Sequence, residues 1–142
     1  MITLIKKKLY LPIIFIISLL LISFSPATER LSLEIEIDIA PNTLNIQNQG
    51  QVVTIHTSIK YFEVDHQSVY LNDIEINSWK SDNRGYFVAK FLMYEVKALF
   101  DSEDLIVPSD NLFTLIGYTT DGTEFTGSQV ITVINILPSG KK

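Results

Sequence analysis

The amino-acid sequence predicts an all-β protein, a β-sandwich of about seven or eight strands with one short helix. Two observations carry this prediction. Short segments of alternating apolar and polar residues recur through residues 31–134, and turn-forming Gly, Pro, Asn or Asp residues separate most of them. In Asn111–Val133, two such segments flank Asp121 and Gly122, a dipeptide typical of hairpin turns. With 142 residues, the chain is long enough for one domain and too short for two comfortable ones.

The hairpin within Asn111–Val133 is expected to have a two-residue type I′ loop, in which both central residues need a positive φ. This loop places Thr120 opposite Thr123 and Tyr118 opposite Phe125. The aromatic pair would help to fix the register of the two strands.

Gly117 and Gly127 lie inside the two arms of this hairpin, where a glycine indicates a bulge or a close approach of another backbone segment. A hairpin cannot bury its apolar side chains alone. The remainder of the domain should therefore supply a second sheet that faces it.

The first strand of the domain is predicted at Leu31–Ile39, where five apolar residues alternate with Ser32 and three acids. One face should be buried and the acidic face solvated, although three acids could also attract a cation. Gln51–Ile59 alternates in the same way and places His56 on its more polar face.

The other expected elements are shorter. Asn72 and Asp73 form a turn-type dipeptide, and Gly85 is expected to adopt a positive φ. Leu92–Phe100 switches to helical spacing and predicts one short helix. The remaining strands are predicted at Thr43–Ile46, Ser68–Leu71, Ile74–Ile76 and Tyr86–Phe91.

Residues 1–27 have the features of an export signal. Lys6–Lys8 provide the positive charge, Leu9–Phe24 is an apolar run of 16 residues, and Ser25-Pro26-Ala27 offers small residues for cleavage. A full membrane span needs about 20 residues. We expect a cleaved signal peptide and a mature chain that begins at Thr28, with an uncleaved N-terminal membrane anchor as the alternative. Residues 28–142 are exported to the cell surface or secreted in both cases.

Charge and cysteine content exclude several classes of function. The chain has 11 basic and 16 acidic residues, and without the three leader lysines the balance is 8 against 16, a net charge of −8. An acidic domain is repelled by phosphate backbones, so nucleic-acid binding is not expected. The chain has no cysteine, which excludes disulfides, thiolate catalysis and cysteine-ligated zinc.

Two segments expected to be loops, Tyr61–Gln67 and Ser78–Arg84, combine aromatic and charged side chains outside the strand pattern. Aromatic residues and arginine dominate binding hot spots, so these segments are candidates for contact with an extracellular protein or glycan. An equally plain interpretation is that their aromatic rings only close the sandwich. The candidate partner-binding residues are Tyr61, Phe62, His66, Trp79 and Arg84.

The acidic segment Asp101–Asp110 could supply oxygen ligands for Ca²⁺. Its spacing differs from that of an EF-hand loop. His56 and His66 lack the spacing of a metal site, and both are expected to be surface histidines. The candidate calcium ligands are Asp101, Glu103, Asp104 and Asp110.

The chain resembles immunoglobulin-like modules found in secreted and cell-surface proteins of bacteria and archaea. The resemblance covers residues 35–134 and is carried by four segments: IDIAPNTLNIQNQG, SVYLNDIEI, DNRGYFVAKF and LFTLIGYTTDGTEFTGSQVITV. It implies an immunoglobulin-like sandwich with a binding, spacer or scaffold role, and no catalytic residues.

Two functions from different classes are therefore considered. The first is a non-enzymatic exported module that binds a protein or glycan. The second is a small exported hydrolase that uses paired carboxylates, because acids are plentiful. The sequence has no G-x-S-x-G motif for a serine nucleophile. A concave pocket with two carboxyl groups facing each other would favour the hydrolase.

Overall fold

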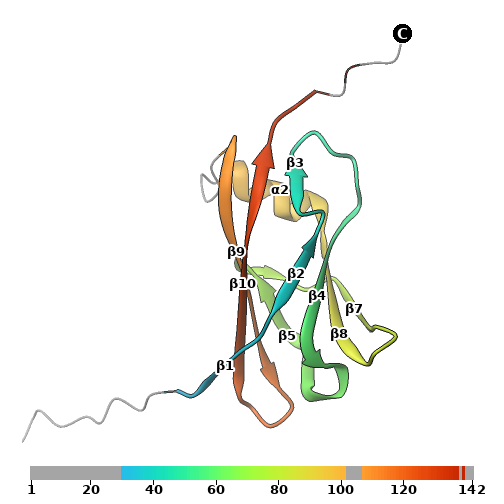
Figure 1. Cartoon of the computed structure of the whole chain (residues 1–142), viewed down its shortest axis with the longest axis vertical. Helices are drawn as coiled ribbons and strands as arrows, with labels where there is room; N and C mark the ends of the chain where they lie inside the picture. The colour runs from blue at the N-terminus through green and yellow to red at the C-terminus, as the bar shows by residue number, and fades with distance from the viewer. Residues whose placement is uncertain (1–29, 102–106, 138, 140–142) are drawn as a thin grey trace, which may run out of the picture. The chain divides into compact units, whose positions relative to one another are not determined.

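Two β-sheets pack against each other from Leu31 onward, as Figure 1 shows for the computed structural model. The structure describes residues 30–101, 107–137 and 139. In sheet A the strand order is β1 (Ser32–Glu34), β10 (Glu124–Ile134), β9 (Ser109–Thr119), β5 (Val64–Leu71) and β6 (Ile74–Glu75), and β3 (Thr43–Asn45) also pairs with β10. In sheet B the order is β2 (Ile37–Ala40), β4 (Val52–Lys60), β8 (Tyr86–Leu92) and β7 (Ser78–Ser81). The predicted all-β fold with two facing sheets is confirmed.

The core lies between the inner faces of the two sheets. Phe87 and Phe91 come from sheet B, Phe113 and Phe125 come from sheet A, and none of the four is more than 1% exposed. Burial of each such side chain stabilises the fold by about 1.5–3 kcal/mol before entropy costs. The alternating pattern predicted for Gln51–Ile59 is confirmed in β4. In β8 the predicted inward residues Phe87, Ala89 and Phe91 are buried, and Val88 is buried as well.

Two short helical segments complete the described fold. The helix predicted at Leu92–Phe100 is present as α2 (Met93–Asp101), and a 3₁₀ turn, η1 (Tyr61–Glu63), follows β4. Met93 and Val96 of α2 are buried against the core. In residues 30–101 and 107–137, no helix is long and apolar enough to cross a bilayer. The leader at residues 1–27, predicted as signal peptide or anchor, lies outside the described residues.

The hairpin of β9 and β10 is antiparallel as predicted, but its loop and register differ from the prediction. Tyr118 lies opposite Glu124, and Phe125 lies opposite Gly117, which shifts the register by one residue. The loop has three residues, because the N–H of Thr119 donates to the carbonyl oxygen of Thr123 (2.8 Å). Gly122 has a φ of 88°, and Asp121 has no positive φ, so the turn is not type I′.

Side-chain hydrogen bonds explain the longer loop. The N–H of Thr123 donates to Thr119 Oγ1 (3.0 Å) and to Asp121 Oδ1 (3.1 Å). The turn between β7 and β8 has the same pattern, since the N–H of Tyr86 donates to Asp82 Oδ1 (2.9 Å). In both loops a side-chain oxygen binds the N–H four residues later, and the glycine before that N–H adopts a positive φ.

Asn72 and Asp73 form a two-residue loop of the kind that the sequence predicted for the hairpin of β9 and β10. Their φ angles are 43° and 69°, so both central residues of this two-residue loop are left-handed. Leu71 and Ile74 pair directly across it. The predicted turn between these two strands is confirmed.

The strand predicted at Leu31–Ile39 is divided between the two sheets, which corrects the prediction of one continuous strand. β1 runs parallel to β10, and β2 runs antiparallel to β4. Leu31 is 87% exposed although its position in the pattern predicts burial. This division and the additional strand β7 raise the number of strands in the described residues to ten.

Gly127 in β10 allows the chain to cross from β1 to β2. A Cβ atom at this position would lie 2.8 Å from the carbonyl oxygen of Ile35 and 2.7 Å from Ile37 Cγ2. The N–H of Ile35 donates to the carbonyl oxygen of Thr126 (2.9 Å) and holds the crossing segment against β10. The close approach expected at this glycine is confirmed.

Candidate functional site

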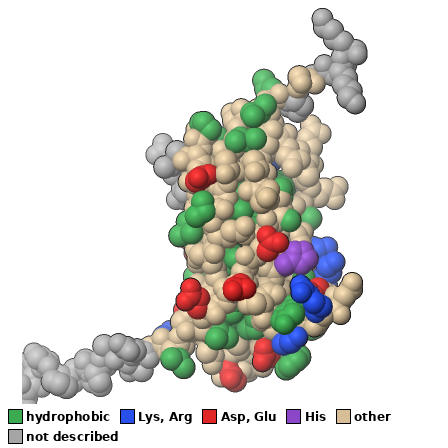
Figure 2. Space-filling view, viewed as in Figure 1, with side chains coloured by type: hydrophobic (Ala, Val, Ile, Leu, Met, Phe, Trp, Pro, Cys, Tyr) green, Lys and Arg blue, Asp and Glu red, His purple; other side chains and the backbone are tan. Residues whose placement is uncertain are grey.

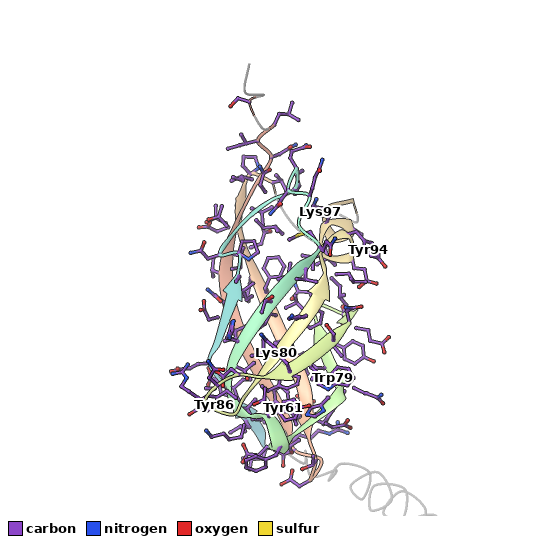
Figure 3. The ribbon with its side chains drawn as sticks, turned by 90° about the vertical axis from the view of Figure 1, so that its right-hand side faces the viewer. Tyr61, Trp79, Lys80, Tyr86, Tyr94 and Lys97 are labelled. Carbon is purple, nitrogen blue, oxygen red and sulfur yellow. The ribbon has the colours of Figure 1, made fainter. Side chains whose placement is uncertain are left out.

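The predicted partner-binding residues gather at one end of the sandwich, where β4 ends and the turn between β7 and β8 lies. The N–H of Tyr61 donates to the carbonyl oxygen of Gly85 (2.9 Å), and Lys60 Nζ donates to that of Arg84 (3.2 Å). Figure 3 shows Tyr61, Trp79 and Tyr86 near this end of the sandwich. The loop-end cluster comprises Lys60, Tyr61, Phe62, His66, Trp79, Arg84 and Tyr86.

The inner part of the loop-end cluster is a group of packed rings. The His66 ring centroid lies 4.3 Å from that of Tyr61, 5.5 Å from that of Trp79 and 5.5 Å from that of Phe87, on which it stacks. His66 Nε2 donates to the carbonyl oxygen of Tyr61 (3.0 Å). Because Tyr61 and Trp79 also pack against the core, these rings close one end of the sandwich.

Two predictions about this group are wrong. His66 is half-buried in β5, although a loop and a surface position were predicted, and Trp79 lies in edge strand β7, where a loop was predicted. β5 begins at Val64, four residues before the predicted strand start at Ser68. Polar residues concealed both segments from the sequence pattern. β7 is an edge strand, and β6 pairs only with Tyr70 and Leu71, so the first half of β5 lies at the edge of sheet A as well. Strands at an edge do not require strict alternation.

A bulge in β5 positions His66. The pairing of Asp65 with Tyr118 and the pairing of Tyr70 with Ile116 differ in register. Between them, Ser68 Oγ accepts a hydrogen bond from the N–H of Tyr118 (2.8 Å) and donates to the carbonyl oxygen of Asp65 (2.7 Å). The Ser68 hydroxyl thus replaces a ladder hydrogen bond where the strand bends.

The outer part of the loop-end cluster is exposed and cationic. Phe62 is 75% exposed, and the side chain of Arg84 is 81% exposed. Lys60 Nζ lies 3.8 Å from the ring centroid of Tyr86, within the range of a cation–π interaction. Sequence reasoning missed Lys60 and Tyr86 because both belong to strands, and only the pairing of β4 with β8 places them opposite each other.

Asp82 fixes the position of Arg84 and Tyr86. Its Oδ1 accepts hydrogen bonds from the N–H of Tyr86 (2.9 Å) and of Arg84 (2.8 Å). The hydrogen bond from Tyr86 is the largest cause that lowers the pKa of Asp82, followed by the Arg84 N–H and the positive charge of Arg84. The folded turn therefore favours the ionised form of the Asp82 carboxyl group.

Replacing Asp82 with Asn should weaken the acid sensitivity of the fold. Because folding lowers the pKa of Asp82 below its ordinary 3.8, the carboxylate stabilises the fold above that pH, and this contribution is lost as the pH falls through the lowered pKa. Thermal melts between about pH 6 and pH 2 should show a shallower fall of Tm for Asp82→Asn than for the wild type. Asp65→Asn controls for the removal of one exposed charge. An equal fall in Asp82→Asn and wild type would contradict the prediction.

A groove of about 540 Å³ lies beside the loop-end cluster on the outer face of sheet B. Arg84 and Tyr86 line it on one side, and Glu36 and Asp38 line it on the side of β2, with His56 also in its lining. Figure 2 shows a histidine side chain beside Lys and Arg side chains, with acids nearby. As predicted, His56 is exposed on the outer face of β4. Glu36 and Asp38 belong to one segment, so both residues line the same wall of the groove.

The predicted calcium ligands are largely outside the described residues. Glu103 and Asp104 lie beyond them, as does the side chain of Asp101. Asp110 is exposed on β9, and its Oδ1 accepts a hydrogen bond from Thr132 Oγ1 (2.7 Å). Among the residues that the structure describes, no three His, Asp or Glu side chains are grouped so as to hold a metal ion. Calcium binding by the acidic segment stays a prediction.

Comparisons of the chain with known protein families, with curated proteins and with solved structures found no match.

Proposed function

We propose that this chain is an exported, non-enzymatic module of the immunoglobulin-like type, which binds a protein or glycan partner at the cell surface. The observation that carries the proposal is the construction of the loop-end cluster. An exposed aromatic ring and an exposed guanidinium lie on a base of rings that is packed into the core.

The strand order supports the immunoglobulin-like assignment. Constant-type immunoglobulin domains have strands A, B, E and D in one sheet and strands C, F and G in the other. If β2, β4, β5, β7, β8, β9 and β10 are taken as A to G in chain order, sheet B reads A-B-E-D and sheet A contains G-F-C. β6 then extends the edge of sheet A beyond strand C.

The packed base favours binding because it reduces the conformational entropy that the loop-end cluster loses when a partner binds. Phe62 follows Tyr61, whose backbone and ring are both fixed, so the position of the exposed ring is partly preorganised. Arg84 is held by the turn that Asp82 organises. Aromatic residues and arginine supply most hot-spot energy at protein interfaces. Phe62 and Arg84 are therefore the expected principal contacts.

Export is supported by the leader sequence. Lys6–Lys8, the apolar run Leu9–Phe24 and the small residues Ser25 and Ala27 together form a secretory pattern. The net negative charge of the exported part disfavours anionic lipid headgroups and nucleic acids as partners. A protein or a neutral glycan remains the expected partner class.

The hydrolase alternative has one observation in its favour, because Glu36, Asp38 and His56 line the same groove. A carboxylate pair in a glycosidase must flank the scissile bond from two sides. Glu36 and Asp38 are two residues apart on one segment and share a wall. The binding function is therefore better supported.

Phe62→Ser and Arg84→Ala should each reduce capture of the native partner about tenfold, since each removes a hot-spot side chain. The measurement is the retention of solubilised cell-surface material by the immobilised wild-type chain and by each variant. Tyr94→Ser is the matched control, because Tyr94 is an exposed aromatic residue of α2 near the other end of the sandwich (Figure 3). Trp79→Ala is unsuitable as a test, because the ring packs against the core and its loss affects stability.

Treatment of the cell-surface material before capture identifies the partner class. Loss of retention after protease treatment indicates a protein, and loss after periodate oxidation indicates a glycan. Equal retention by wild type, Phe62→Ser and Arg84→Ala would remove the loop-end cluster from the binding site. If the wild type hydrolyses a glycan or peptide and Asp38→Asn abolishes this turnover, the hydrolase is the correct function and the binding module is wrong.

A further inference from the structure

Charge is segregated between the two sheets. The strands of sheet B contain Lys60, Lys80 and Lys90 and one acid, Asp38. The strands of sheet A contain neither Lys nor Arg. Their acids are Glu34, Asp65, Glu75, Asp110 and Glu124.

Sheet A also carries a group of exposed apolar side chains on its outer face. Their exposed fractions range from 39% for Tyr118 to 58% for Leu112 and Val130. Leu112 and Val130 are direct partners on β9 and β10, and Tyr70 and Ile116 are direct partners on β5 and β9. This apolar face comprises Tyr70, Leu112, Ile116, Tyr118 and Val130.

Acids lie next to the apolar face on several sides. Asp65 and Glu124 pair with Tyr118 from the two neighbouring strands, and the Tyr118 hydroxyl donates to Glu124 Oε2 (3.1 Å). Glu75 pairs with Tyr70. Asp110 lies two residues before Leu112 on the same strand, and therefore on the same face. The hydrogen-bonded hydroxyl groups of Thr114 and Ser128 lie between Leu112–Val130 and Ile116 on this face, so the apolar side chains stand on both sides of one hydroxyl pair. Apolar side chains with a carboxylate rim are the pattern of a docking surface for a partner of opposite charge.

We propose that the apolar face is a second binding surface, separate from the loop-end cluster, for a protein segment with an apolar stripe flanked by Lys or Arg. Charge complementarity identifies this partner. The absence of any Lys or Arg from the strands of sheet A leaves its carboxylates without a cation on these strands. A cationic rim on the partner would pair with them.

Other occupants fit the charge pattern less well. A second copy that docked through its own apolar face would place acids against acids. A second copy that docked through sheet B would supply lysines, but on the strands of sheet B the one exposed large apolar residue is Val52, at 36%. An anionic membrane surface would be repelled by the same carboxylates.

The dimensions of the apolar face fit a small interface. Three strands about 4.8 Å apart, each rising about 3.4 Å per residue over roughly ten residues, present on the order of 500 Å². Contact over this area would bury about 1,000 Å² in total, the lower range of specific and transient interfaces. The proposed partner is therefore a short segment bound reversibly.

Two synthetic 18-residue amphipathic peptides test the proposal, one composed of Leu and Lys and the other of Leu and Glu. Titration calorimetry with the protein recovered from an exporting host should detect binding of the Leu/Lys peptide alone. The double variant Leu112→Thr/Ile116→Thr removes apolar area without changing charge, and should raise the Kd about tenfold. Val52→Thr makes the same kind of change on the outer face of sheet B and should leave the Kd unchanged. Circular dichroism confirms that each variant is folded.

Charge variants provide the second arm of the test. Asp65→Asn/Glu75→Gln should weaken binding of the Leu/Lys peptide and reduce its dependence on salt. The proposal is wrong if the Leu/Glu peptide binds as well as the Leu/Lys peptide, or if Leu112→Thr/Ile116→Thr leaves the Kd unchanged. Sedimentation of the wild type as a dimer that Ile116→Thr dissociates would assign the apolar face to a second copy. Phe62→Ser should not affect binding of the Leu/Lys peptide. A negative peptide result therefore contradicts only the proposal for the apolar face, and leaves the loop-end cluster to its own test.

Discussion

Replacing Gly127 with Ala should lower the free energy of unfolding by about 1–3 kcal/mol, because the new methyl group has no space. Its carbon would lie 2.8 Å from the carbonyl oxygen of Ile35, which is backbone and cannot rotate away. The crossing segment between β1 and β2 would have to move, and its hydrogen bond to Thr126 would lengthen. Urea denaturation followed by tryptophan fluorescence measures the change.

Ser128→Ala is the matched control for Gly127→Ala. Ser128 is the next residue of β10 and is exposed, so the substitution should change stability by less than about 0.5 kcal/mol. A Gly127→Ala variant as stable as Ser128→Ala would show that the segment between β1 and β2 does not lie this close to Gly127.

Gly122→Val should also lower the free energy of unfolding by about 1–3 kcal/mol, for a different reason. Gly122 has a φ of 88°, which a β-branched residue strongly disfavours. A Cβ at this position has no atom within 4 Å, so the loss comes from the backbone conformation alone. Thermal or urea denaturation of the variant tests this expectation.

Gly122→Asn separates backbone strain from other effects of replacing this glycine. Asn adopts left-handed conformations more readily than Val, so its destabilisation should be smaller, below about 1 kcal/mol. Equal losses for Val and Asn would contradict the explanation by φ. An unchanged melting curve for Gly122→Val would show that the residue does not have a positive φ in solution.

The candidate site was partly predictable from the sequence. Aromatic and charged residues outside the strand pattern marked Tyr61–Gln67 and Ser78–Arg84, and the structure brings these segments together through the rings of His66 and Trp79. The division into exposed Phe62 and Arg84 and half-buried His66 and Trp79 was not predictable. It depends on which rings pack against Phe87, a contact between residues far apart in the chain.

The register of the β9–β10 hairpin was contained in the sequence, although the turn dipeptide pointed to another one. Phe113 and Leu115 must share the inner face with Phe125 and Ile131, and a register shifted by one residue would put the two pairs on opposite faces. Burial of these side chains outweighs the preference of Asp121 and Gly122 for a two-residue loop. The hydrophobic pattern was the stronger signal.

The sequence by itself determined the class of the fold, the faces of the main strands and most of the turns, because alternation and turn chemistry act between near neighbours in the chain. Only the tertiary structure decided that Leu31–Ile39 crosses between sheets, since its alternating pattern suits either sheet and Gly127 on a distant strand makes the crossing possible. The tertiary structure also decided that sheet A collects acids without Lys or Arg, because strand order is set by long-range pairing. A local pattern indicates which side of a strand is buried, whereas the packing of the whole domain determines which strands lie next to it.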